Sequence, residues 1–176
     1  MTRMAWLKGL VRAGVVAATM AVALSATGCT EILANAAHDN YIVDETRKPW
    51  PEAPEFVFQA ARTAMLEQGY TIESMDELNF TLRTVTRASG VNSNPGSYSY
   101  VTVTVRPAGN GADVEVVEHN HLVSDQGKVV DLDQRLGMVE FAILRRVNPQ
   151  RAADIEQTAD AKADEVRAER AKKKTE

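Results

Sequence analysis

The stretch that decides the fold is "SYSYVTVTVR", residues 97–106, followed shortly by "ADVEVVEHNHLV", residues 112–123. Valines alternate with tyrosines and threonines in the first segment, and with charged residues and histidines in the second. Alternation with a period of two is typical of a β-strand that buries one face. Residues 70–75 and 78–85 alternate in the same way. These four successive segments predict an antiparallel meander.

Helical periodicity flanks the predicted strands on both sides. Residues 54–69 carry apolar side chains at helical spacing, and Gly69 stands where a left-handed cap would end a helix. A second apolar stripe steps by three and four residues from Val129 through Leu132 and Leu136 to Val147. It predicts a helix that stops before Asn148-Pro149.

The fold class expected from this order is α+β. We predict a four-stranded antiparallel meander covered on one face by two helices. Tyr41-Ile42-Val43 is a candidate extra edge strand at the N-terminal side. Residues 150–176, rich in alanine and in charges of both signs, predict a polar C-terminal helix or arm with an apolar stripe too thin to bury strongly.

The N-terminal 28 residues have the pattern of a secretory signal peptide. Arg3, Lys8 and Arg12 are the only charges before Glu31. The uncharged run from 13 to 28 is 16 residues long, which is short of the roughly 18 needed to predict a membrane-spanning helix.

The only cysteine of the chain follows this leader in the sequence "ATGC", residues 26–29. The segment resembles the bacterial lipobox, although Ala26 stands where that family usually has leucine. The resemblance implies that Cys29 is acylated and becomes the mature N-terminus. Two or more acyl chains hold a protein stably on a membrane. The resemblance also implies that Thr30, in place of aspartate, directs the protein to the periplasmic side of the outer membrane.

These patterns divide the chain into four predicted parts. They are a cleaved signal peptide at 1–28, the lipidated cysteine with a tether at 29–52, an α+β domain at 53–147, and a charged, alanine-rich helix or arm at 148–176.

The element order and the phrase "AMLEQGYTIESMDELNFTLRT", residues 64–84, are similar to small envelope lipoproteins with a helix-grip type domain. The C lipoprotein of the outer-membrane β-barrel assembly machine represents that group. The resemblance covers roughly residues 40–147 in pattern and carries no catalytic residues.

Composition and motifs exclude several function classes. Removal of the leader leaves 17 basic and 24 acidic residues, a net charge near −7, so no basic face for nucleic acid is expected. The sequence has no GxSxG, HExxH or phosphate-binding glycine loop. We therefore expect a non-enzymatic protein without a cofactor.

Two groups of residues are candidate sites. His119 and His121 lie two apart on a predicted strand, so both imidazoles could reach one metal ion, although zinc requires three or four ligands. Tyr98, Tyr100, Arg83 and Arg106 fall on the predicted open face of the sheet, as a docking surface for a peptide or a glycan.

Three functions remain open on this basis. The first is an envelope lipoprotein that binds or helps assemble another envelope component, such as a protein or peptidoglycan. The second is a small-ligand module with a cavity between helix and sheet, lined by Phe80, Leu82, Val103 and Leu136. The third is a metal-binding protein.

Overall fold

The computed structural model describes residues 29–88 and 95–173. The predicted signal peptide, 1–28, lies outside the described residues. The chain divides into two compact units, Asp39–Thr158 and a smaller one formed by the described residues of Met1–His38 and Ala159–Glu176.

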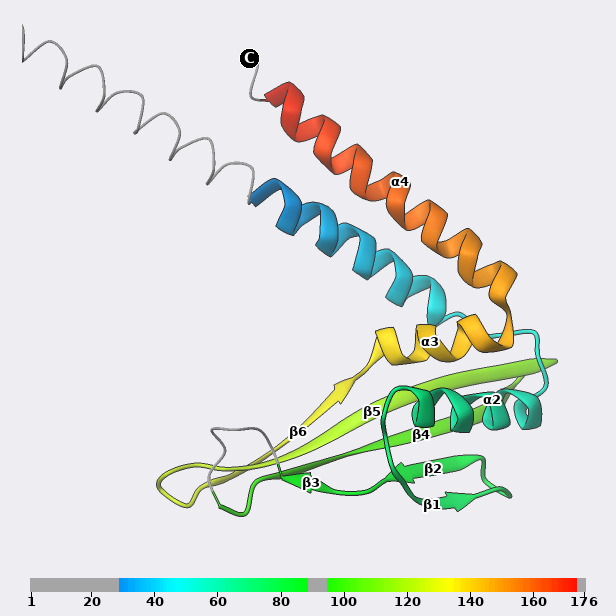
Figure 1. Ribbon diagram of the computed structural model, residues 1–176, viewed down its shortest axis with the longest axis vertical. Helices are drawn as coiled ribbons and strands as arrows, with labels where there is room; N and C mark the ends of the chain where they lie inside the picture. The colour runs from blue at the N-terminus through cyan, green and yellow to red at the C-terminus, as the bar shows by residue number, and fades with distance from the viewer. Residues whose placement is uncertain (1–28, 89–94, 174–176) are drawn as a thin grey trace, which may run out of the picture. The chain divides into compact units, whose positions relative to one another are not determined.

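The larger unit is built on an antiparallel sheet, which confirms the predicted α+β class (Figure 1). The strand order is β1-β2-β4-β5-β6. The short strand β3 pairs with the same edge of β4 as β2 does, farther along that strand. The strands are β1 Ile72–Asp76, β2 Thr81–Thr84, β3 Arg87–Ala88, β4 Tyr98–Ala108, β5 Gly111–Val123 and β6 Val129–Arg135. The sheet therefore has six strands, where the sequence predicted four.

Two helices, α2 (Pro54–Glu67) and α3 (Gly137–Val147), pack against each other and on β4 and β5. They cover the sheet face that carries Val101, Val103 and Val105, as the alternation predicted. The main chain turns after α2 at Gly69, whose φ of +81° matches the predicted left-handed cap. Burial of this apolar layer is the main stabilising term of the unit.

The long β4–β5 hairpin turns through two residues, Gly109 and Asn110. Gly109 has φ +59°, a conformation that costs glycine nothing and that two-residue hairpin turns require. Gly111 follows, and a Cβ on it would lie 1.8 Å from the carbonyl oxygen of Trp50. That close approach exists because Trp50 exchanges two backbone hydrogen bonds with Ala112, of 2.7 and 2.8 Å.

The prediction of a single helix from Val129 to Val147 is wrong for its first half. Residues 129–135 form β6, and helix α3 begins only at Gly137. The sequence "VVDLDQR" alternates with a period of two as well as stepping by three and four, and β-branched valine and aspartate are weak helix formers. Residues 129–135 form a strand because they pair with the C-terminal half of β5, residues 117–123. The predicted stop at Asn148-Pro149 is confirmed.

The candidate strand at residues 41–43 is also wrong. The chain is helical from residue 29 to residue 46, within the segment expected to be a tether. Helical spacing places Ile42 and Thr46 on one face, and both are buried. The Thr46 hydroxyl donates to the Ile42 carbonyl over 2.7 Å. Leu78, predicted inside a strand, is exposed in a turn where Asp76 accepts from backbone N–H groups.

The predicted C-terminal helix is confirmed as α4, Pro149–Lys173, but its apolar stripe is buried, contrary to expectation. In the larger unit Ala152 and Ile155 are buried. In the smaller unit Ala159 and Ala163 are buried.

Within the smaller unit, contacts between polar and charged side chains join the two helical segments. Arg167 contacts Glu31 over 3.0 Å, and His38 lies 3.5 Å from Asp160. The hydrogen bond from the Arg167 guanidinium lowers the pKa of the Glu31 carboxyl below its ordinary value.

The residues predicted to line a ligand cavity have different environments. Leu82 and Val103 are fully buried and face each other across the β2–β4 pair. Phe80 packs on Phe58, with ring centroids 5.8 Å apart. Leu136 is half-buried just before α3.

We predict that Gly111→Ala destabilises the larger unit by about 2–4 kcal/mol, because the new methyl group displaces Trp50 and breaks its two backbone hydrogen bonds. Gly127→Ala is the matched control, since a Cβ there meets nothing within 4 Å and adds only positive-φ strain, about 1–2 kcal/mol. Urea unfolding followed by Trp50 fluorescence measures both, because residues 29–176 contain no other tryptophan. Equal losses in the two variants would show that the Trp50 contact does not constrain the hairpin.

Candidate functional site: the open face of the sheet

The sheet face opposite α2 and α3 gathers aromatic and charged side chains from neighbouring strands. Tyr98, Tyr100 and Thr102 of β4 point to this face because they alternate with the buried valines of the same strand. The register places Tyr100 beside His119 and Tyr98 beside His121. The next strand continues both rows with Asp133 and Asp131. The predicted common face of the two histidines is therefore confirmed.

The first row crosses the sheet from one edge strand to the other. The ring of Tyr100 stacks on His119 with centroids 4.7 Å apart, and His119 Nδ1 lies 2.8 Å from Asp133 Oδ1. On its other side, the Arg83 guanidinium lies 4.1 Å from the centroid of Tyr100. Glu73 completes the row with a 3.2 Å ion pair to Arg83. Acid, base, aromatic, base and acid follow one another across β1, β2, β4, β5 and β6.

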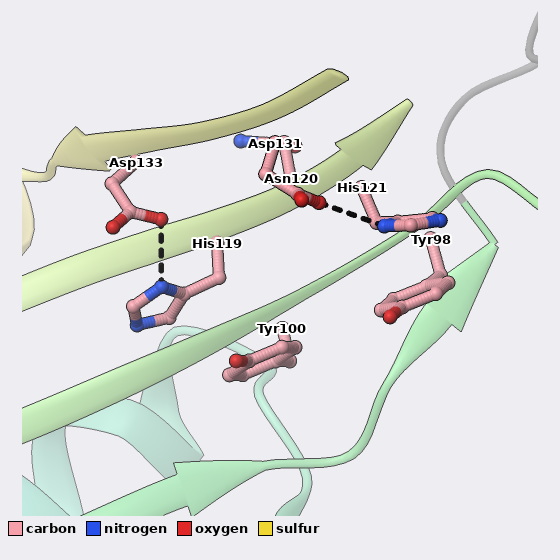
Figure 2. Close-up of a pocket in the computed structure, with 7 residues that line it drawn as sticks. All are labelled: Tyr98, Tyr100, His119, Asn120, His121, Asp131 and Asp133. Atoms are coloured by element: carbon pink, nitrogen blue, oxygen red, sulfur yellow. Dashed lines mark hydrogen bonds and ion pairs between the residues drawn. The ribbon is translucent and has the colours of Figure 1, made fainter. Parts of the chain in front are cut away.

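The second row repeats half of this arrangement. Tyr98 stacks on His121 with centroids 4.6 Å apart, and His121 Nδ1 lies 2.7 Å from Asp131 Oδ1 (Figure 2). Ala88 of β3 is the cross-strand neighbour of Tyr98, and among the described residues the guanidinium that lies over a tyrosine of the two rows is that of Arg83, over Tyr100. Tyr98 is accordingly more exposed than Tyr100.

His119 also contacts Thr102, whose Oγ1 lies 2.9 Å from its Nε2. An ionised carboxylate can only accept, so Nδ1–H donates to Asp133, and the Nε2 of the neutral ring accepts from the Thr102 hydroxyl. Hydroxyl, imidazole and carboxylate stand in the order of a nucleophilic triad. However, Thr102 is paired with β2 and β5 on its two sides, so the nearby backbone N–H groups are engaged in the sheet and cannot stabilise an oxyanion.

Arg106, predicted to share the docking surface, lies apart from it. It stands six residues along β4 from Tyr100, about 20 Å at the strand rise. Its guanidinium pairs with Glu115 over 2.9 Å. The structure thus brings together Arg83, Tyr98 and Tyr100 from the predicted group.

The metal site predicted at His119 and His121 gains no third ligand. Within the described residues, no three His, Cys, Asp or Glu side chains form a group that could hold a metal ion. Each imidazole instead uses Nδ1 for its own aspartate, as Figure 2 shows.

The two rows border a shallow hollow of about 130 Å³ on the open face. Its lining is polar and aromatic and comprises Tyr98, Tyr100, His119, Asn120, His121, Asp131 and Asp133. A second hollow of about 410 Å³ lies beside β1, between that strand and Arg62 and Leu66 of α2.

Asp131 and Asp133 are site residues that the sequence reasoning missed, because it placed them on a helix. The signal that could have found them is the alternation of Val130, Asp131, Leu132 and Asp133, which follows a turn at Gly127. A strand there pairs the aspartates with the two histidines of the preceding strand.

An ion pair between half-buried Arg135 and fully buried Glu140 fixes the end of β6. Glu140 of α3 is fully buried and accepts hydrogen bonds from the Val116 N–H (2.9 Å) and from Arg135 (2.7 Å). Arg135 also donates to the Val114 carbonyl over 2.9 Å. Burial lowers the pKa of Arg135, but the hydrogen bond and charge of Glu140 outweigh it, so the pKa lies above its ordinary value. Arg135 therefore stays charged and joins the end of the sheet to α3.

In comparison with known proteins, no family model and no curated protein sequence matches this chain.

We predict that Arg83 and Tyr100 are energetically coupled by about 0.5–1 kcal/mol, the scale of an exposed cation–π contact. The measurement is a double-mutant cycle of Arg83→Ala and Tyr100→Val, read as free energy of unfolding in urea. The matched cycle of Arg83→Ala with Tyr98→Val should be additive, because the Arg83 guanidinium lies over the Tyr100 ring and the cross-strand neighbour of Tyr98 is Ala88. Equal coupling in the two cycles would contradict the difference between the rows.

Proposed function

We propose that this protein is a non-enzymatic lipoprotein, anchored through Cys29 on the periplasmic side of the outer membrane, that binds another envelope component through the open face of its sheet. The anchoring part rests on the leader and the "ATGC" segment. Cys29 is exposed, as a lipidated residue must be. No helix within residues 29–88 and 95–173 is long and apolar enough to cross a membrane.

The observation that carries the binding part is the pair of Tyr–His–Asp rows. Stacking and hydrogen bonding hold these side chains in place before any partner arrives, which lowers the entropy lost on binding. Tyrosine is enriched where proteins recognise one another, because it offers a large contact area with a polar end.

The size of the hollow bordered by the two rows favours a macromolecular partner over a free small molecule on this face. Pockets that enclose small ligands usually measure about 300–1,000 Å³. A hollow of about 130 Å³ on an open surface fits one side chain or one edge of a larger partner. The engaged N–H groups around Thr102 support the non-enzymatic part.

We predict that Cys29→Ser moves the folded protein from the membrane fraction to the soluble fraction, because the proposed anchor is covalent lipid. Metabolic labelling with palmitate should mark the wild-type protein and not the variant. The control is Thr30→Ser, which keeps the cysteine and should remain membrane-bound. A Cys29→Ser protein that stays with the membrane would mean that another segment holds it there.

The binding part is tested by replacing Tyr98 with a photoreactive phenylalanine analogue in cells. We expect irradiation to join this position to an envelope component. Leu78 is the matched control, because it is 92% exposed in the β1–β2 turn, away from the rows. Equal crosslinking from both positions, or none from Tyr98, would contradict a binding face. If the wild-type protein hydrolysed an ester and Thr102→Val lost that activity, the result would contradict the non-enzymatic part of the proposal.

A further inference from the structure

The edge strand β6 combines a regular free edge with side chains of two kinds. Within the part of the chain that the structure describes, β6 pairs with β5 alone, over seven successive residues without a shift of register (Figure 1). An exposed and regular edge offers unpaired N–H and C=O groups to another strand. The opposite edge strand, β1, has a register shift between Ile72 and Ser74, which makes it a poorer template.

The side chains of β6 alternate between acidic and apolar. Asp131 and Asp133 lie on the face of the two rows, with side chains 76% and 69% exposed. Val130 and Leu132 lie on the opposite face and are 40% and 51% exposed. Exposed aliphatic side chains on a free edge are a feature that soluble proteins usually avoid.

Each row of the open face ends at β6 in a carboxylate. Among the described residues, Asp131 and Asp133 each have one partner, the histidine of the neighbouring strand. In the first row each carboxylate lies beside a base, Glu73 beside Arg83 and Asp133 beside His119, so a cation on a strand added beyond Asp133 would give this carboxylate a second basic neighbour. The same holds beyond Asp131, two residues away on the same face.

A second copy of β6 does not satisfy this pattern. An antiparallel pair that overlaps all seven residues places Asp131 opposite Asp133 of the other copy, twice. Like charges directly opposite each other destabilise a strand pair. In this register, the same residues that attract a cationic strand oppose the pairing of β6 with its own copy.

We propose that β6 accepts an extended segment of a partner protein as an added strand, in which lysine or arginine alternates with aliphatic residues. The cations lie opposite Asp131 and Asp133, the aliphatic side chains cover Val130 and Leu132, and the backbone pairs along the free edge. This inference rests on the proposed binding function and names the chemistry of its partner.

The test uses full-length protein in a neutral maltoside detergent at about 0.15 M salt, where surface charges farther apart than about 8 Å are largely screened. The probe is a fluorescein-labelled peptide of nine residues that alternates lysine and valine. One comparison peptide has the same composition with lysines and valines in separate blocks. The other is the alternating peptide with an N-methyl group on every backbone nitrogen, which keeps the side-chain charges and blocks backbone pairing in either strand direction.

We expect the alternating peptide to bind at least tenfold more tightly than either comparison peptide, by fluorescence anisotropy. Binding should also slow amide hydrogen exchange in β6. The Asp131→Asn, Asp133→Asn double variant keeps an acceptor for each histidine and should weaken binding roughly three- to tenfold, the scale of two exposed ion pairs. The Glu165→Gln, Glu169→Gln control removes the same charge from exposed positions of α4 and should bind like wild type.

Three results overturn the inference. In the first, the alternating peptide does not bind. In the second, it binds no better than the N-methylated peptide. In the third, the slowed hydrogen exchange in β6 comes from a dimer of the protein. Each result leaves the proposed function standing if the Tyr98 crosslink is still formed. Loss of that crosslink with peptide binding intact would remove the proposed function and keep the edge as a strand acceptor.

Discussion

The register of the β4–β5 hairpin is the constraint on which both the core and the open face depend. A side chain in a strand changes face with every residue, so a shift of one residue in β4 would turn its buried valines outward and its tyrosines toward the helices. The turn at Gly109 and the contact of Gly111 with Trp50 hold the register at one end. Burial of the valine layer therefore also places Tyr98 and Tyr100 opposite their histidines.

The sequence predicted well those elements whose two faces differ strongly. Alternation in β4 and β5 predicted the buried and open faces correctly, because each strand buries valines and exposes polar groups. It failed for β6, where nearly every side chain is exposed and no face is buried to impose a period of two. The same segment also fitted a helical stripe, so Asp131 and Asp133 were unpredictable until β5 supplied a strand to pair with. Trp50 was missed because its pairing with Ala112 is a contact between distant parts of the chain.

The Arg135–Glu140 ion pair decides where the strand ends and α3 begins. A pair with one fully buried partner gives little net stability, because removing the Glu140 charge from water is costly. Its effect here is geometric, since Glu140 holds the Val116 N–H and Arg135 holds the Val114 carbonyl. The first contact joins the start of α3 to β5, and the second joins the end of β6 to β5. The position of β6, and so of its two aspartates, is fixed from the helix side as well as from the hairpin.

The carboxylates at the edge of the open face act on two kinds of strand pairing. They oppose pairing with a second copy of β6, and they favour a cationic partner strand. A sheet that ended in neutral aliphatic residues would pair with any exposed strand, including a copy of itself. Ending both rows in carboxylates makes pairing depend on the charge of the incoming strand, so the repulsive element supplies the specificity. The histidines contribute by fixing the direction of those carboxylates, because each Nδ1–H holds one carboxylate oxygen. The rows and the edge are therefore one surface, with its aromatic part over β4 and β5 and its selective part along β6.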